Sequence, residues 1–299
     1  MVTYTTTYFL HVQLRRFALD FGNFYVGKPP YQMYVEYFRP AVEEHNVPIV
    51  LFHGGSHTGS CYLSTPDGRK GWAPYLVEQG WVTYIVDWPG HGRSGFSEVL
   101  AAMSLQKVVE AGVELLKRIG PAVVLTHSRS GPVGWKLAEL APKHVAAVVG
   151  VAPGPPANLI PVPEDDPKTQ PVNLLIFPTD SHLEYTRSSQ FPQGASLEYR
   201  AFIVPEGTRS LGERNNAGSL GLYVRGPEAL TGVPVLVVTG DQDAGHPRKV
   251  DEATARYFSG DFVWLADADL LGHGHMMMLE HGNLEVADVF LNWLRSRGI

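Results

Sequence analysis

Short β-branched runs, each ending near a Gly, Pro, Asp or His, recur along this 299-residue chain. Six of them are predicted strands: 48–53, 82–87, 122–126, 146–151, 234–240 and, more weakly, 261–266. Continuous apolar runs of this length are typical of parallel strands that are buried on both faces. Amphipathic segments with helical spacing lie between them, most clearly at 104–119 and 284–297. The alternation predicts an α/β fold with a mostly parallel central sheet flanked by helices.

Two departures from this regular alternation predict the domain organisation. Segments 21–27 and 32–38 alternate in polarity and predict an antiparallel start to the sheet. From Pro153 to about Thr231 the periodic pattern stops and prolines accumulate. A structureless loop of that length is rare inside a compact domain. We therefore expect a core of 1–153 and 232–299 with a cap inserted at 154–231, the alternative being a partly disordered loop.

Composition narrows the class of protein. The formal net charge is −6 and no block of like charge stands out, so we expect neither a nucleic acid nor a membrane surface as a partner. Cys61 is the single cysteine, which excludes an intrachain disulfide and favours a reducing compartment. The N-terminal segment does not resemble a secretory signal. These features together predict a cytoplasmic location.

The stretch Thr126-His127-Ser128-Arg129-Ser130 follows a predicted strand and precedes a predicted helix. A sharp strand-to-helix turn can expose a serine hydroxyl, usually in the pattern small-x-Ser-x-small. Thr126 and Ser130 fit the two small positions around Ser128. Choosing Ser130 would put Pro132 at a small position, whereas Pro132 suits the first helical turn. Ser128 is therefore the candidate nucleophile, although a solvated turn serine is the plainer interpretation.

A serine hydroxyl needs a base and a carboxylate that orients the base. The late stretch from Leu271 to Glu280 places His275 in a glycine-rich turn before a helix, with His273 as the second choice. The strand at 234–240 is followed by Asp243, our first choice for the acid, and by Asp241, our second. Each residue alone could be a surface histidine or a helix cap. Their order along the chain and their places at strand ends are more specific.

Donors for an oxyanion are predicted at the end of the strand 48–53. There His53-Gly-Gly-Ser56 forms a turn whose backbone amides are exposed. The amide of Gly55 or Ser56, together with that of Arg129, would form an oxyanion hole. An ordinary tight turn is the alternative.

The chain resembles the α/β-hydrolase superfamily. Its loop Asp87-Trp-Pro-Gly-His-Gly-Arg-Ser94 is similar to a D-x-x-G-x-G-x-S loop of that superfamily. Further motifs resemble a little-characterised branch whose best-known member is a secreted bacterial carboxylesterase; these are Gln32–Tyr37, Thr65–Trp72, Thr126–Ser128, Gly274–Met278 and Asn283–Ala287. The resemblance covers most of the chain outside the expected cap. It implies Ser128 as the nucleophile and His275 as the base.

The acid departs from the pattern of that branch. Its glutamate follows the strand after the nucleophile helix, and Ala152 occupies the matching position here. Alanine cannot orient an imidazole. Either the acid has moved to Asp243, the commoner place in the superfamily, or the triad is incomplete.

These features predict an enzyme that hydrolyses a carboxylic ester or lactone through an acyl-enzyme intermediate, with no metal and no organic cofactor. The expected substrate is a small apolar or aromatic molecule, because the cap is rich in aromatic residues and poor in charge. The alternatives are a lyase, cyclase or acyltransferase on the same scaffold, or a ligand-binding protein with weak catalysis. The sequence leaves the oligomeric state open.

Overall fold

The computed structural model describes residues 19–95, 98–163, 175–176 and 186–299. Its centre is a single eight-stranded sheet in the order β1-β2-β4-β3-β5-β6-β9-β10. The strands are β1 (Leu19–Val26), β2 (Met33–Pro40), β3 (Ile49–Phe52), β4 (Thr83–Asp87), β5 (Ala122–His127), β6 (Val145–Val151), β9 (Val235–Thr239) and β10 (Asp261–Trp264). β2 pairs antiparallel with β1 and with β4, and every later pairing in the sheet is parallel. The predicted α/β fold and its antiparallel start are confirmed.

Side chains of the central strands build two cores, one on each face of the sheet. Along β3, Val50 and Phe52 enter one core, whereas Ile49 and Leu51 enter the other. This alternation follows from the two-residue period of a strand. Both faces are covered by helices, which explains why all four positions of β3 are buried.

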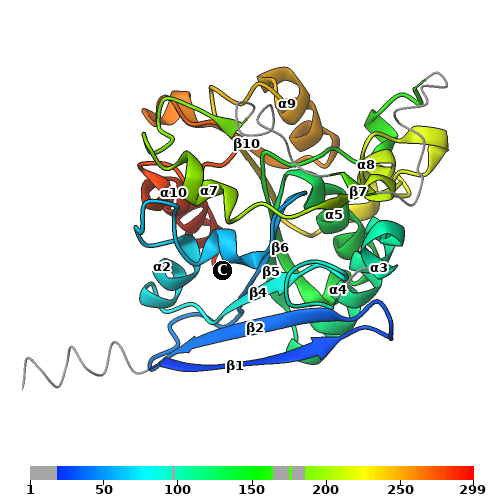
Figure 1. Cartoon of the computed structure of the whole chain (residues 1–299), viewed down its shortest axis with the longest axis horizontal. Helices are drawn as coiled ribbons and strands as arrows, with labels where there is room; N and C mark the ends of the chain where they lie inside the picture. Colours follow the sequence, from blue (N-terminus) through cyan, green and yellow to red (C-terminus); the bar gives the residue numbers. More distant parts are fainter. Residues whose placement is uncertain (1–18, 96–97, 164–174, 177–185) are drawn as a thin grey trace, which may run out of the picture.

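The helices divide between the two faces (Figure 1). α4 (Leu105–Ile119) and α5 (Gly131–Leu140) pack on the core that contains Val50 and Phe52. α2 (Trp72–Glu78) and α10 (Asn283–Ser296) pack on the opposite core through Trp72 and Phe290, whose rings meet edge to face. The sequence predicted α4 and α10 closely. None of the described helices has both the length and the apolar character needed to cross a bilayer.

Outside the segment between β6 and β9, three of the described helices were not predicted from the sequence. α2 is short and contains Pro74, and α3 (Glu98–Ala102) is only five residues long. α9 (Arg248–Tyr257) buries few side chains, and two of them, Asp251 and Thr254, are polar. A helix that buries polar groups carries little of the apolar periodicity by which helices are recognised.

The described part of the chain between β6 and β9 holds short elements. They are η4 (Ala157–Leu159), β7 (Leu175–Ile176), α7 (Ser196–Arg200), β8 (Glu206–Gly207), α8 (Thr208–Arg214), η5 (Ala217–Ser219) and η6 (Pro227–Leu230). β7 pairs with β8 apart from the central sheet. The Val204 amide donates to the Ser56 carbonyl, and the Ser189 amide donates to the Gln242 side chain. The segment thus touches loops that follow β3 and β9, whereas the exact cap bounds, 154–231, stay a prediction.

Candidate active site

The turn after β5 is tightly built around Ser128. Ser128 has a φ of 54°, in the left-handed region that costs energy for any residue with a Cβ. The short helix η2 (Ser128–Ser130) then leads directly into α5. A Cβ on Gly131 would lie 2.3 Å from the carbonyl oxygen of Gly154, so the turn leaves room only for glycine there. The closely packed turn keeps Ser128 in this strained conformation, and the turn places its side chain at the carboxyl end of the sheet.

The two serines of this turn make different contacts. Ser130 is buried, and its Oγ accepts from the His127 amide at 2.8 Å while lying 3.0 Å from the carbonyl oxygen of Phe52. Ser130 therefore ties the turn to β3. Ser128 instead lines a cavity. The structure supports the choice of Ser128 over Ser130.

Ser128, His275 and Asp243 form one hydrogen-bonded chain. The Ser128 Oγ lies 2.9 Å from Nε2 of His275, and Nδ1 of His275 lies 2.7 Å from Oδ2 of Asp243. Because a carboxylate only accepts, Nδ1 carries the imidazole proton, and Nε2 is left to accept from the serine. Ala152 has no carboxylate to offer. Asp243, on the loop after β9, is the acid that contacts His275.

Asp243 is ionised in this environment. Burial by itself raises the pKa of its carboxyl, but the charge of His275 and the hydrogen bond to it outweigh burial. Together with His246 and the Gly245 amide they lower the pKa of Asp243 to about 2. The carboxylate is therefore negative at neutral pH and can stabilise a positively charged His275.

The second choices from the sequence have other partners. His273 is buried with Nδ1 2.9 Å from Oε2 of Glu280, and Glu280 also accepts from the Gly274 amide. Asp241 accepts from the amides of Gly272 and His273. These contacts fix the loop that carries His275, and neither side chain joins the Ser128 chain.

His127 supports the same loop from the other side. Its Nε2 lies 2.9 Å from the carbonyl oxygen of His275, so this nitrogen donates. Burial, and then the charge of His275, hold the pKa of His127 well below its usual range. His127 is therefore neutral and anchors the backbone of His275.

A further histidine–carboxylate pair, formed by His246 and Asp251, lies beside His275 and was not predicted from the sequence. The His246 ring stacks on His275 with centroids 5.1 Å apart, and its Nδ1 is 3.1 Å from Asp251. Asp251 also accepts from Thr239 at 2.6 Å. One ligand atom each from Asp243, His246 and His275 lies within 4.8 Å of the others, so these residues could reach one metal ion. The expectation of no metal and no cofactor stays a prediction.

The turn after β3 is fixed by His53. Its Nδ1 lies 2.7 Å from the Gly54 carbonyl oxygen, and its Nε2 accepts from the Trp88 amide at 3.1 Å. These bonds require one neutral tautomer. A Cβ on Gly54 would lie 3.0 Å from the Cβ of Ser128, so the glycine turn approaches the serine closely.

The amides predicted from the sequence to bind an oxyanion differ in their contacts. The Ser56 amide donates to Oε2 of Glu206 at 2.5 Å, which corrects the suggestion that it faces an oxyanion. Gly55 lines the cavity beside Ser128, and its amide donates to no group among the described residues. Arg129, whose amide lies in the first turn after the strand, lines the same cavity. Gly55 and Arg129 remain the candidate donors.

The neutral His53 makes stability sensitive to acid. Burial, and then the charge of His91, lower the pKa of His53 to about 4. Since an unfolded histidine titrates near ~6.5, the unfolded state binds this proton first, and stability is lost as the pH falls from ~6.5 to about 4. Between pH 7 and pH 4, the free energy of unfolding should therefore fall by about 3 kcal/mol less in His53→Gln than in the wild type. Urea unfolding at both pH values measures this.

The control for this comparison is His281→Gln, because His281 is exposed. It should keep the wild-type dependence on pH. Equal pH dependence of the wild type and His53→Gln would show that His53 is not a cause of the acid sensitivity.

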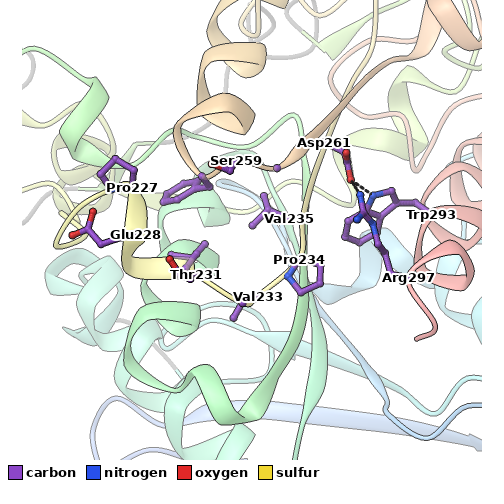
Figure 2. A pocket seen from close by; sticks show the side chains of 14 residues that line it. Pro227, Glu228, Thr231, Val233, Pro234, Val235, Ser259, Asp261, Trp293 and Arg297 are labelled. Carbon is purple, nitrogen blue, oxygen red and sulfur yellow. Dashed lines mark hydrogen bonds and ion pairs between the residues drawn. The ribbon is translucent and has the colours of Figure 1, made fainter.

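The cavity at Ser128 measures about 160 Å³. Its described lining residues come from the turns after β3 and β5, the loop of His275 and the segment before β9; they are Gly55, His57, His127, Ser128, Arg129, Thr186, Leu211, Arg214, His275 and Met276. A larger cavity, of about 600 Å³, lies at the amino ends of β9 and β10, where Val235 and Asp261 line it (Figure 2). It shares none of its described lining residues with the cavity at Ser128. There Asp261 is held by Trp293 and Arg297, and no histidine stands among the described lining residues. The smaller cavity is the one with a polarised serine.

Comparison with known proteins gives a consistent family. The profile of the alpha/beta hydrolase family matches residues 49–289. A protein of Fungal sp. (strain ATCC 74256), named as the probable secreted lipase phiG, is 27% identical over 341 residues, which cover 92% of this chain and 89% of that protein.

Solved structures share the fold. A novel bacterial esterase matches with a TM-score of 0.61 at 22% identity, covering 93% of this chain and 95% of that one. The carboxylesterase CesB of Bacillus subtilis matches with a TM-score of 0.60 at 17% identity, covering 95% and 96%. Because the family match spans most of the chain and the sheet carries Ser128 at its carboxyl end, this protein belongs to the alpha/beta hydrolase family.

Proposed function

We propose that this chain is a serine hydrolase that cleaves a carboxylic ester or lactone. The observation that carries the proposal is the continuous hydrogen-bonded chain from Ser128 through His275 to Asp243. A serine hydroxyl is a weak nucleophile at neutral pH unless a base takes its proton. In such a chain the histidine takes the proton as the serine attacks. Membership of the alpha/beta hydrolase family and a relative named as a lipase support the same reaction class.

The geometry supports the following reaction. Ser128 Oγ attacks the carbonyl carbon while His275 Nε2 takes its proton, and Asp243 stabilises the resulting imidazolium. The amides of Gly55 and Arg129 donate to the oxyanion. The tetrahedral intermediate collapses, the alcohol leaves with the proton from His275, and an acyl-enzyme remains. Water, deprotonated by the same histidine, then releases the acid and restores Ser128.

Covalent labelling by a fluorophosphonate tests the activated serine. We expect the wild type to gain the mass of one phosphonyl group as fluoride leaves as HF, with the label on the peptide that contains Ser128. Ser128→Ala should show no labelling, whereas Ser130→Ala is the matched control for a serine two residues away. Because Ser130 ties the turn to β3, labelling of that variant is read only after its circular dichroism matches the wild type. A folded wild type that stays unlabelled, or labelling that persists in Ser128→Ala, would contradict the proposal.

Turnover in water enriched in ¹⁸O separates hydrolysis from other reactions on this scaffold. A hydrolase places one labelled oxygen in the released acid. A lyase, cyclase or acyltransferase gives a product without it.

The cytoplasmic location also stays a prediction, and the fungal relative is named as probably secreted. Fractionation of cells that express the natural gene would decide between the two locations.

A further inference from the structure

The cavity beside Ser128 is lined by cationic and imidazole groups. Two arginines, Arg129 and Arg214, line it together with three histidines, and no Asp or Glu stands among the described lining residues. Among the described lining residues, large apolar side chains come from Leu211 and Met276 alone. This lining does not match the apolar or aromatic substrate expected from the sequence.

Arg129 is held in place by a buried carboxylate. Its Nη1 lies 3.0 Å from Oε1 of Glu206 and 3.3 Å from Oγ of Ser210. Glu206 is itself buried and accepts from the Ser56 amide and from Ser210. These bonds engage one of the three guanidinium nitrogens of Arg129 and fix the direction of the other two.

The remaining donors of Arg129 lie against Gly55, which lines the cavity together with Ser128. Among the described residues, its Nε and Nη2 donate to no group, and 14% of its side chain is exposed. A Cβ on Gly55 would lie 2.5 Å from Cζ and 2.8 Å from both Nε and Nη2. The glycine thus lets the guanidinium lie against the turn whose amide is the candidate oxyanion donor.

Arg214 adds positive charge to the same cavity. It ends α8, and its Nη1 donates to Asn215 Oδ1 at 3.1 Å. A guanidinium cannot lose its proton in a protein, so the charge persists at every working pH. In a partly enclosed cavity the attraction between this charge and an anionic group is stronger than in bulk water.

We propose that the natural ester carries a carboxylate and that Nε and Nη2 of Arg129 bind it. Arg presents parallel N–H groups that match the two oxygens of a carboxylate. The proposal rests on the proposed ester hydrolysis and names its substrate class. The carboxylate can belong to the acid part of the ester or to the alcohol part, and the experiment distinguishes the two.

The wild type is assayed with pairs of esters that differ in charge but not much in size. Monomethyl glutarate and methyl valerate test the acid part, and 3-acetoxypropanoate and butyl acetate test the alcohol part. We expect kcat/KM to favour the carboxylate member of one pair by about 10- to 100-fold, the range for a hydrogen bond to a charged group. A preference for the neutral member in both pairs overturns the proposal.

Variants then assign the preference to Arg129. Arg129→Gln should remove most of the preference, chiefly through KM, and Arg129→Lys should restore part of it. Arg225→Gln is the matched control, because Arg225 is exposed, pairs with Glu139 and lies outside the cavity lining. An unchanged preference in Arg129→Gln overturns the assignment.

Calorimetry of glutarate binding to Ser128→Ala tests the carboxylate site without catalysis. It also needs no Arg129 variant, so the test still works if those variants fail to fold. Saturable binding that weakens as salt is added supports the carboxylate site, and no binding overturns it. Failure of the proposed hydrolysis looks different, because it appears as an unlabelled Ser128 and as no turnover of any ester.

Discussion

Asp243→Asn is expected to lower kcat by about 10⁴-fold while the protein stays folded. The Asp243 carboxylate accepts the Nδ1 proton of His275 at 2.7 Å and so leaves Nε2 free to accept from Ser128. An asparagine can turn its NH₂ toward Nδ1, and this favours the tautomer in which Nε2 already carries the proton. The shape of the side chain barely changes, so the loss falls on the chemical step. Steady-state kinetics with a short ester and circular dichroism measure the two effects.

Asp241→Asn is the matched control for this substitution. Asp241 lies two residues away, and its partners among the described residues are backbone amides, which the asparagine oxygen can also accept. Its kcat should stay within about threefold of the wild type, since a change to a group outside the hydrogen-bonded chain removes little transition-state stabilisation. If Asp243→Asn kept its turnover while Asp241→Asn lost it, the acid would be Asp241.

Glu206→Ala is expected to destabilise the protein by about 3–5 kcal/mol, the range for breaking a buried ion pair by removing one partner. Burial raises the pKa of Glu206, but the charges of Arg129 and His91 and the hydrogen bonds hold it well below the usual range. The carboxylate is thus ionised in the folded protein. Its removal leaves Arg129 without its ion pair and the Ser56 amide without its acceptor. Urea unfolding at pH 7 measures the loss.

Glu252→Ala provides the comparison. Glu252 pairs with Arg256 across 3.5 Å on the surface, with 43% and 75% of the side chains exposed. Exposed pairs contribute about 0–1 kcal/mol, so this variant should unfold close to the wild type. Similar small losses in both variants would mean that the Glu206 network does not stabilise the fold.

The sheet could be predicted from the sequence because its strands are buried on both faces. A strand such as β3 must then be apolar at every position, and the pattern is visible without any knowledge of its neighbours. α9 gave no such signal, because it buries Asp251, which contacts His246 and Thr239, and Thr254, which donates to the Val250 carbonyl. Polar groups that are satisfied by distant partners look like surface residues in a sequence.

The candidate site was predicted only where local sequence signals define it. Ser128 was selected over Ser130 by the register of one strand and one turn, which are local. The choices between His275 and His273 and between Asp243 and Asp241 stayed open, because each pair differs by two residues in one loop. The Ser56–Glu206 contact joins positions 150 residues apart, and no local pattern announces it.

The sequence by itself determined the α/β class, the order of the central strands along the chain and the turn that carries Ser128. These depend on apolar periodicity and on local steric limits, which are written in neighbouring residues. Only the tertiary structure decided which histidine and which aspartate meet Ser128, and that Glu206 engages Ser56 and Arg129. Those contacts depend on how loops from separate strands converge. Hydrogen bonds and ion pairs form over a few ångströms, so the folded sheet must first bring these loops together.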